Sequence, residues 1–254
     1  MKITTHTIRQ SKNKKAIAAL TAYDTITATL ADRAGVDLLL VGDSVGTTLL
    51  GYKTTIPVTL DAMLHHTAAV ARAEPRALVV ADLPFAEGHY AYDTLLNSCT
   101  ALMQDAGAEA IKIEGGEKMA PKVALLSEAG IPVLGHIGLL PQQVLQQGRY
   151  RSFGKTDTER KQLLADAQAL ETAGVFAIVG EMIDPEVAAE ITQSLSIPFI
   201  GIGSGQECDG QILVSTDLLG LTLGKVPSFA KQYANLAESV EQAFTDYVQD
   251  LRQQ

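Results

Sequence analysis

The chain has 254 residues, 46% of them hydrophobic, and its 20 Lys and Arg against 29 Asp and Glu give a net charge of −9. The apolar fraction excludes a disordered chain, and the acidity disfavours a general nucleic-acid or anionic-membrane surface. With no apolar run of roughly 18 residues, no signal-peptide pattern in residues 1–15 and no CxxC pair, we expect a cytoplasmic globular protein without membrane or nucleic-acid partners.

Short apolar runs alternate along the chain with longer segments of helical periodicity. The expected strands are 17–22, 37–42, 77–82, 110–114, 132–136, 176–181, 198–203 and 218–222. The expected helices are 25–34, 59–73, 92–106, 117–129, 157–173 and 185–195, followed by a long amphipathic helix over 229–251. Thr156 and Glu159 have capping-box spacing, and Gly35, Gly107 and Gly174 stand where helices would stop.

The strand pattern favours one particular architecture. Nearly continuous apolar strands, such as residues 38–41, are typical of a parallel sheet whose two faces are both buried. Eight strands separated mostly by helices favour a (βα)8 TIM barrel over a doubly wound sheet. Because no linker or composition shift divides the chain, we expect residues 1–254 to form a single-domain α/β barrel with an extra C-terminal helix.

Polar residues stand where five successive strands end, which is the face that carries catalytic groups in barrels. These residues are Asp43, Ser44, Asp82, Lys112, Glu114, His136 and Glu181. A single Asp at such a place is often a helix cap, but several carboxylates gathered in a half-buried site are costly unless a cation neutralises them. Oxygen ligands without a Cys or His cluster indicate a hard ion, Mg²⁺ before Ca²⁺ or Mn²⁺.

Individual residues in this set have alternative interpretations. Lys112 and Glu114 share a strand face, so they either serve substrate and metal or form a structural ion pair. His136 is a ligand-facing residue or a hydrogen-bonded structural histidine. Glu181 lies across the barrel mouth from Asp43, where a carboxylate would act as a base. The segment 201–205, rich in glycine, is either a phosphate-binding loop or a tight turn.

Taken together, these segments resemble the ketopantoate hydroxymethyltransferase family over roughly residues 15–235. The matching segments, in family order, are Thr21–Asp24, Val41–Ser44, Ile56–Thr59, Val79–Phe85, Ile111–Gly116, Gly135–Leu139, Pro141–Gln142, Ile200–Gly205, Asp209–Gln211 and Asp217–Gly220. No single segment is decisive, but the ordered set is highly specific.

The resemblance implies a Mg²⁺-dependent barrel enzyme that makes 2-dehydropantoate from 3-methyl-2-oxobutanoate and the co-substrate 5,10-methylenetetrahydrofolate. It implies that Asp43, Asp82 and Glu114 form the metal set and that Glu181 is the proton acceptor. The residues implied in substrate binding are Asp43, Ser44, Asp82, Lys112 and His136. The resemblance also implies a homo-oligomer, a decamer in this family.

The sequence departs from the family pattern in three places near the predicted active face. These are Ala86–His89, Gly180 before the predicted base, and Gln146–Arg151. The departures bear on side-chain selectivity and on folate contacts, for which Arg149, Arg151 and Lys155 are candidates. The alternative enzyme class is a Mg²⁺-dependent 2-oxo-acid lyase or mutase of the phosphoenolpyruvate mutase and isocitrate lyase kind. A catalytically inactive barrel is disfavoured because every predicted catalytic carboxylate is present.

Overall fold

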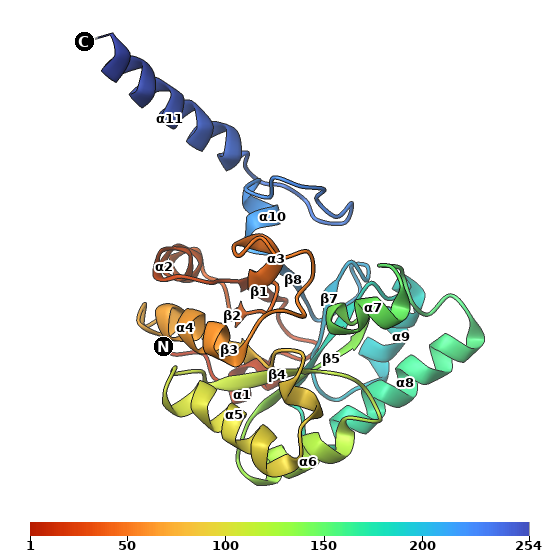
Figure 1. Ribbon diagram of the computed structural model, residues 1–254. Helices are drawn as coiled ribbons and strands as arrows, with labels where there is room; N and C mark the ends of the chain where they lie inside the picture. The colour runs from red at the N-terminus through yellow and green to blue at the C-terminus, as the bar shows by residue number, and fades with distance from the viewer. Residues whose placement is uncertain (254) are drawn as a thin grey trace. The chain divides into compact units, whose positions relative to one another are not determined.

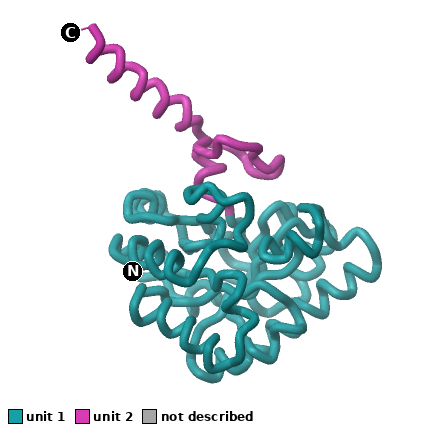
Figure 2. Tube along the Cα trace, in the orientation of Figure 1, with its two compact units in different colours: residues 1–212 teal, residues 213–254 magenta. Residues whose placement is uncertain are grey.

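The structure is a computed structural model that describes residues 1–253 (Figure 1). The chain divides into two compact units, Met1–Ile212 and Leu213–Gln254 (Figure 2). Each unit is described by itself below, and the expected single domain over residues 1–254 stays a prediction.

Eight parallel strands close into a barrel in which each strand pairs with its neighbours in chain order. Their bounds are β1 (Ile17–Thr21), β2 (Leu38–Val41), β3 (Leu78–Asp82), β4 (Ala110–Glu114), β5 (Val133–Gly138), β6 (Ala177–Glu181), β7 (Phe199–Ile202) and β8 (Gly210–Leu213). At the closing seam, the N–H of Ile17 donates to the carbonyl of Asp209 at 2.9 Å. The predicted (βα)8 TIM barrel is thereby confirmed.

Helices follow the strands around the barrel (Figure 1). Those before β8 are α1 (Thr5–Gln10), α2 (Thr25–Arg33), α3 (Val45–Thr48), α4 (Leu60–Ala71), α5 (Tyr92–Gln104), α6 (Ala120–Glu128), α7 (Val144–Gln147), α8 (Asp157–Thr172) and α9 (Pro185–Ser194), with 3₁₀ turns η1 (Glu87–His89) and η2 (Pro141–Gln143). Thr156 caps α8 by accepting the N–H of Glu159, as its spacing predicts. Gly35, Gly107 and Gly174 have positive φ just beyond helix ends, which confirms them as stops.

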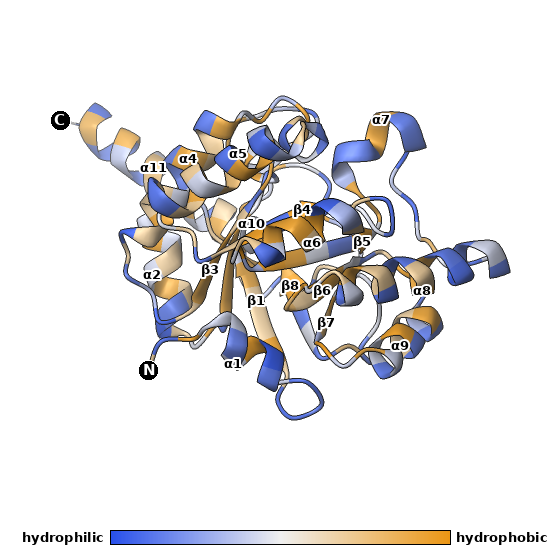
Figure 3. Cartoon of the chain, turned by 90° about the horizontal axis from the view of Figure 1, so that it is seen from below, coloured by the Kyte–Doolittle hydropathy of each residue, from blue (hydrophilic) through white to orange (hydrophobic). Residues whose placement is uncertain are grey.

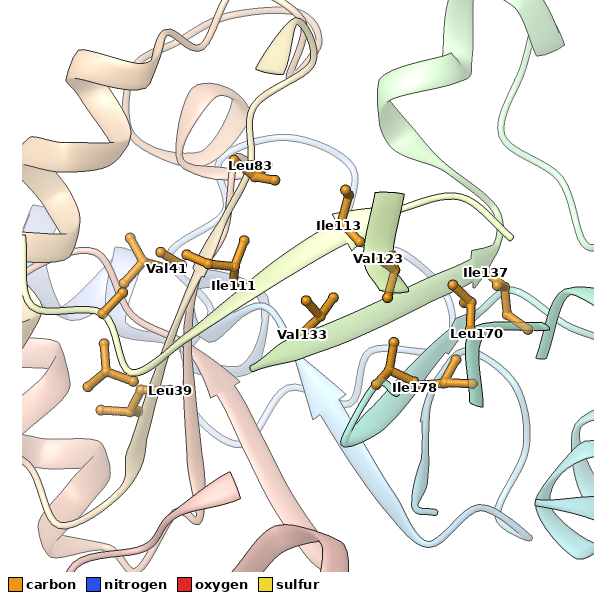
Figure 4. Packing of buried hydrophobic residues seen from close by; sticks show 14 of the residues in the cluster. Leu39, Val41, Leu83, Ile111, Ile113, Val123, Val133, Ile137, Leu170 and Ile178 are labelled. Carbon is orange, nitrogen blue, oxygen red and sulfur yellow. The ribbon is translucent and has the colours of Figure 1, made fainter. Parts of the chain in front are cut away.

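Strand alternation separates the buried side chains into two layers. One series packs inside the barrel and includes Leu38, Leu78, Ala110, Leu134 and Ala177. The other series faces the helices, so that strand residues such as Leu39, Ile111 and Ile178 pack with helix residues such as Val123 and Leu170 (Figure 4). In the hydropathy view the strands are mostly apolar, whereas the surrounding helices carry both polar and apolar residues (Figure 3).

The eighth strand was predicted in the wrong place. Residues 218–222 belong to the end of α10 (Ser215–Leu219) and the turn after it, and Gly220 closes that helix with φ 67°. The true β8 is only four residues long and alternates buried with half-buried positions, so it gives a weak apolar signal. The doublet Leu218-Leu219 resembled a strand because a short apolar run does not distinguish strand from helix.

In the second unit, the long C-terminal helix is α11 (Leu236–Arg252). It is shorter than predicted, because residues 229–235 are mostly irregular. None of its residues is buried, although Phe244, Tyr247 and Leu251 are large and apolar. Across residues 1–253, no helix combines the length and the apolar character needed to cross a membrane.

Candidate active site

The charged residues of the site continue the inward-facing series of the strands. In β3, Leu78 and Val80 point into the barrel and Asp82 is the next residue of the same series. The same alternation carries Lys112 and Glu114 in β4, His136 in β5 and Glu181 in β6 to the interior at the carboxyl end. Asp82, Lys112, Glu114 and His136 are between 1% and 7% exposed. A layer of buried charge therefore lies above the apolar layers of the barrel.

Lys112 is bound to Asp82. Its Nζ lies 2.8 Å from both carboxylate oxygens of Asp82, and the backbone N–H of Asp43 donates to Asp82 Oδ2 at 3.3 Å. The ion pair that the sequence left open, Lys112 with Glu114, is therefore wrong, because the lysine bonds to the neighbouring strand instead. Neither Asp43 nor Asp82 caps a helix, so the simplest non-functional explanation of these residues does not apply.

Gln142 joins the ends of three strands and was not identified as a site residue from the sequence. Its side-chain Nε2 donates to Asp43 Oδ2 at 3.0 Å and to the carbonyl of Leu83 at 2.8 Å. Its backbone N–H donates to Glu114 Oε2 at 3.2 Å. The only signal in the sequence was its place in the matching pair Pro141–Gln142.

Burial among other carboxylates raises the pKa of two acidic residues of the layer, Asp43 and Asp82. Burial raises the pKa of Asp43 to about 8, and the negative charges of Asp82 and Glu114 add to the shift. Burial alone would lower the pKa of Lys112, but Asp82, Glu114 and Asp43 outweigh it and raise that pKa. The lysine therefore stays charged, while the surplus of carboxylates makes the pocket a good environment for a further cation.

His136 lies between two carboxylates. Its Nδ1 is 3.6 Å from Glu114 Oε1 and its Nε2 is 3.3 Å from Glu181 Oε2. Burial and Lys112 oppose protonation of the ring, but the two carboxylates prevail and raise the pKa of His136. Both ring nitrogens and Glu114 Oε1 are buried without a well-aligned hydrogen bond. The histidine thus lies between the acidic set and Glu181, and its contact with a ligand stays a prediction.

The backbone around Glu181 is constrained from both sides. The carbonyl of Glu181 accepts the N–H of Leu139 at 2.8 Å, and a Cβ on Gly138 would lie 2.3 Å from that same carbonyl oxygen. The next residue, Met182, has φ 51°, a left-handed conformation that costs a non-glycine residue about 1 kcal/mol or more. Such strain concentrates at functional sites, and here it follows the one carboxylate of the set that is partly exposed, with 16% of its side chain accessible.

Ser44 is oriented by a buried tyrosine. The hydroxyl of Tyr23 lies 2.8 Å from Ser44 Oγ, and the carbonyl of Tyr23 lies 2.7 Å from Nδ1 of His66. Burial raises the pKa of Tyr23, so its hydroxyl stays protonated near neutral pH. The sequence placed Ser44 at the site but gave no sign that Tyr23, in the matching segment Thr21–Asp24, would support it.

The glycine-rich segment after β7 is a tight turn in this structure. Ser204 Oγ donates to the carbonyl of Gly180 at 2.8 Å and accepts the N–H of Ile183 at 2.9 Å. Gly203 and Gly205 have positive φ. These bonds tie the ends of β6 and β7 together, and they account for the segment without a bound anion.

The three divergent segments have distinct structural settings. Ala86–His89 contains the 3₁₀ turn η1. A Cβ on Gly180 would lie 2.1 Å from Cζ of Phe199, so that ring fills the space of a larger residue. In the third segment, Arg151 donates to Glu159 at 2.7 Å and covers the ring of Phe153 at 3.9 Å. Its guanidinium is therefore already engaged by Phe153 of its own loop and by Glu159 in the first turn of α8.

The remaining folate candidates, Arg149 and Lys155, are exposed on either side of Arg151. They are free to move toward a ligand in a way that Arg151 is not. Their contact with folate stays a prediction.

The donors of the site fit Mg²⁺, although no complete ligand set is assembled. Within residues 1–253, no three His, Cys, Asp or Glu side chains are grouped as ligands of a single metal ion. Glu114 Oε1 is nevertheless a buried carboxylate oxygen with no hydrogen bond closer than the 3.6 Å contact to His136, and burial beside Asp82 and Glu114 raises the pKa of Asp43. Mg²⁺ commonly takes one or two carboxylates and completes its shell with water and substrate oxygens. The set Asp43, Asp82 and Glu114 stays a prediction.

A (βα)8 barrel with buried acidic, basic and imidazole groups at the carboxyl ends of its strands has the architecture of a barrel enzyme. The sequence profile of the ketopantoate hydroxymethyltransferase family matches residues 2–254. The chain belongs to this family, whose members are transferases.

Several curated relatives carry the same name. The chain is 46% identical over 253 residues to a 3-methyl-2-oxobutanoate hydroxymethyltransferase of Thermoanaerobacter sp. (strain X514), covering 99% of this chain and 92% of the relative. It is 50% identical over 252 residues to the enzyme of that name from Caldivirga maquilingensis. That match covers 99% of this chain and 94% of the relative.

Solved structures with the same fold have much lower sequence identity. A phosphoenolpyruvate phosphomutase from Streptomyces platensis subsp. rosaceus superposes with a TM-score of 0.67 at 16% identity, covering 97% of this chain and 88% of that one. A phosphonopyruvate hydrolase solved with oxalate and Mg²⁺ superposes with a TM-score of 0.64 at 14% sequence identity. The match covers 99% of this chain and 87% of that one. At this identity the likeness supports the fold alone.

Proposed function

We propose that the protein transfers a hydroxymethyl group from 5,10-methylenetetrahydrofolate to 3-methyl-2-oxobutanoate, giving 2-dehydropantoate for pantothenate biosynthesis in the cytoplasm. Family membership supports the overall reaction. The observation that carries the chemical assignment is the separation of the buried carboxylates into two groups. Asp43, Asp82 and Glu114 form an acidic set, and Glu181 stands on the other side of His136, 3.3 Å from Nε2.

The acidic set is the proposed place for the divalent ion. Asp43 and Asp82 would hold Mg²⁺, with Glu114 completing the set directly or through water. When bound, the ion would supply the positive charge that stabilises the enolate of a 2-oxo acid. Asp43 would have to be ionised to bind it, and its raised pKa makes that ionisation dependent on the cation or on alkaline pH.

The side chains around the ion would orient the keto acid. Lys112 is fixed by Asp82 at 2.8 Å and remains charged, so it offers a cationic contact to an anionic substrate. Ser44 offers a hydroxyl whose direction is set by Tyr23. His136 would contact the substrate from the strand beside Glu181. These contacts explain how an acidic protein would bind an anion at one local site.

Glu181 is the proposed base. Its carboxylate would take the proton from the carbon beside the keto group, and that carbon would then bond to the methylene carbon carried by the folate. Both bonds from the methylene carbon to folate nitrogens, N5 and N10, would break. Water would supply the hydroxyl oxygen of the product, and the two nitrogens would take up one proton from water and the proton removed by Glu181. Glu181 suits this role because it is partly accessible and its backbone is constrained by Leu139 and Met182.

The direct test is product formation from the two proposed substrates. We expect 2-dehydropantoate by mass spectrometry when Mg²⁺, the branched keto acid and the methylene folate are all present. EDTA should abolish product and excess Mg²⁺ should restore it. If a 2-oxo acid is instead cleaved or rearranged without folate, the chain is a lyase or mutase, and the proposal is wrong.

We also propose that the protein is a homo-oligomer, a decamer as in its family. The second unit supplies the structural support, since α11 has apolar side chains and no buried residue. Within this unit, a cavity of about 810 Å³ is lined in part by Leu221, Leu223, Val240, Phe244 and Val248. A second copy of the chain would cover these side chains.

Light scattering after size exclusion tests the assembly. The full-length protein should elute as an assembly of about ten chains, and the double substitution F244D/V248D should reduce it. A wild-type protein that runs as a monomer at micromolar concentration would overturn the proposal.

A further inference from the structure

Gln142 occupies an unusual position among the polar residues of the barrel. It lies in η2, immediately after β5, and is only 7% exposed. Its three hydrogen bonds reach Asp43 after β2, Leu83 after β3 and Glu114 at the end of β4. The side-chain amide makes two of these bonds and the backbone N–H makes the third, and a buried amide without such partners would cost about 1–3 kcal/mol.

Gln142 binds one oxygen of each of two carboxylates, those of Asp43 and Glu114. The amide takes Oδ2 of Asp43, and the backbone N–H takes Oε2 of Glu114. The other oxygen of Glu114, Oε1, is buried without a hydrogen bond. One oxygen of each carboxylate is thus fixed by Gln142, and the second oxygen of Glu114 has only the 3.6 Å contact with His136 Nδ1. This is how hydrogen bonds from outside a metal site orient the carboxylates that bind the ion.

We propose that Gln142 is a positioning residue for the divalent ion. It fixes the rotation of Asp43 through its side chain and that of Glu114 through its backbone. The bond to the Leu83 carbonyl fixes the amide itself, so Nε2 and not Oε1 faces Asp43. The inference rests on the metal site of the proposed function.

The two parts of Gln142 can be separated by substitution. Gln142→Met keeps the size of the side chain and the backbone N–H that binds Glu114, but it removes both bonds of the amide. Gln142→Asn keeps an amide on a side chain one methylene shorter, which brings it out of reach of Asp43. The neighbour Gln143 belongs to the same 3₁₀ turn and is half-buried, so Gln143→Met is the matched control.

The experiment measures the affinity of the full-length protein for Mn²⁺, a spectroscopic substitute for Mg²⁺, by electron paramagnetic resonance in the absence of substrates. We expect Gln142→Met and Gln142→Asn to weaken Mn²⁺ binding by about 10- to 100-fold. Gln143→Met should bind as the wild type does. Circular dichroism with thermal unfolding of each metal-free variant establishes that the folded protein is being compared.

The outcomes distinguish this inference from the proposed function. If the wild type does not bind Mn²⁺, or if Asp43→Asn binds it equally well, the proposed metal site is wrong. If Asp43→Asn loses binding but both folded Gln142 variants bind like the wild type, the metal site stands and the role of Gln142 is overturned. A lower unfolding temperature with unchanged affinity would likewise mark Gln142 as structural only.

Discussion

Two buried lysine–aspartate pairs lie at opposite ends of the barrel and serve different purposes. Lys12 is 2.8 Å from Asp209 near the start of β1, and Lys112 is 2.8 Å from Asp82 at the carboxyl end of the strands. The side chains of the first pair are 9% and 3% exposed, and those of the second are 5% and 2%. Distance and burial therefore do not distinguish them.

The groups that surround the two lysine–aspartate pairs distinguish them. Asp209 also accepts the backbone N–H groups of Asn13 and Phe199, at 3.1 Å and 2.9 Å, while Lys12 donates to the carbonyl of Thr192. Each charged side chain of that pair therefore also binds backbone groups of neighbouring segments. The pair of Lys112 instead shares its layer with Asp43 and Glu114, so that three carboxyl groups lie near one lysine. The Lys12–Asp209 pair, in which every charge has a local partner, stabilises the folded chain. The Lys112–Asp82 pair lies beside further carboxyl groups that could bind a ligand.

We expect the largest effect on reaction rate from a substitution at the carboxyl end of the strands. Glu181→Gln should slow Mg²⁺-dependent exchange of solvent deuterium into the carbon beside the keto group of 3-methyl-2-oxobutanoate by about 10²- to 10⁴-fold, because it removes the proposed base. NMR of the substrate without folate measures this step. Glu186→Gln, an exposed residue of the next helix, is the control. Exchange by the Glu181 variant at the wild-type rate would show that another group is the base.

Substituting each lysine in turn tests whether its pair contributes to stability or to activity. Lys12→Met should lower the free energy of unfolding in urea by about 3–5 kcal/mol, because it leaves Asp209 buried without its cation. Activity per folded molecule should change little. Lys112→Met should instead reduce kcat/KM by roughly 100-fold or more, since it removes the cationic contact proposed for the substrate. Equal losses of activity in the two variants would remove the distinction between the pairs.

The pH dependence of stability sharpens the comparison. In metal-free protein the pKa of Asp43 is about 8, above its value in the unfolded chain, so the folded state binds the extra proton between about pH 4 and pH 8. Stability should therefore fall as pH rises through this window and level off above it. The groups facing Asp43 are Asp82, Glu114, Lys112 and Gln142.

Asp43→Asn should remove much of that fall and raise the unfolding temperature of metal-free protein at pH 9 relative to the wild type. Mg²⁺ should restore the stability of the wild type but not add to that of the variant. Thermal unfolding with EDTA or Mg²⁺ from pH 5 to pH 9 measures both. A variant with the same slope as the wild type would place the buried proton elsewhere.

The smallest expected effect concerns the support of Ser44. Tyr23→Phe keeps the ring but removes the hydroxyl 2.8 Å from Ser44 Oγ, a bond worth about 0.5–1.5 kcal/mol. We expect kcat/KM to fall by about 3- to 10-fold. In a Ser44→Ala background the same change should have no further effect, because the partner is already absent. An additive loss would show that Tyr23 acts by another route.

The sequence predicted those features that depend on local pattern. Alternation in apolar strands was enough to bring Asp82, Lys112 and Glu181 to one end of a barrel. It did not reveal which strand Lys112 would bond to, since that depends on the register of β3 against β4, in which Asp82 is paired with Lys112. Gln142 was missed as a site residue because its contacts come from a turn, and a turn has no periodicity to analyse.

Backbone strain was equally hidden. Nothing in the sequence singles out Met182 as a residue with positive φ, because methionine has no preference for that conformation. The conformation is imposed by hydrogen bonds from Met182 to Ile202 and from Phe153 to Met182, both at 2.8 Å. These are tertiary contacts, and they follow only from the closed barrel.

The contact between Gly180 and Phe199 has an evolutionary consequence. The ring of Phe199 is fully buried, and a Cβ at position 180 would lie 2.1 Å from it, so the two positions must change together. A larger residue at position 180 would be deleterious here on its own and tolerated only after the ring is replaced by a smaller side chain. The residue behind Glu181 is therefore subject to epistasis, and the order of substitutions limits which ancestral sequences were viable.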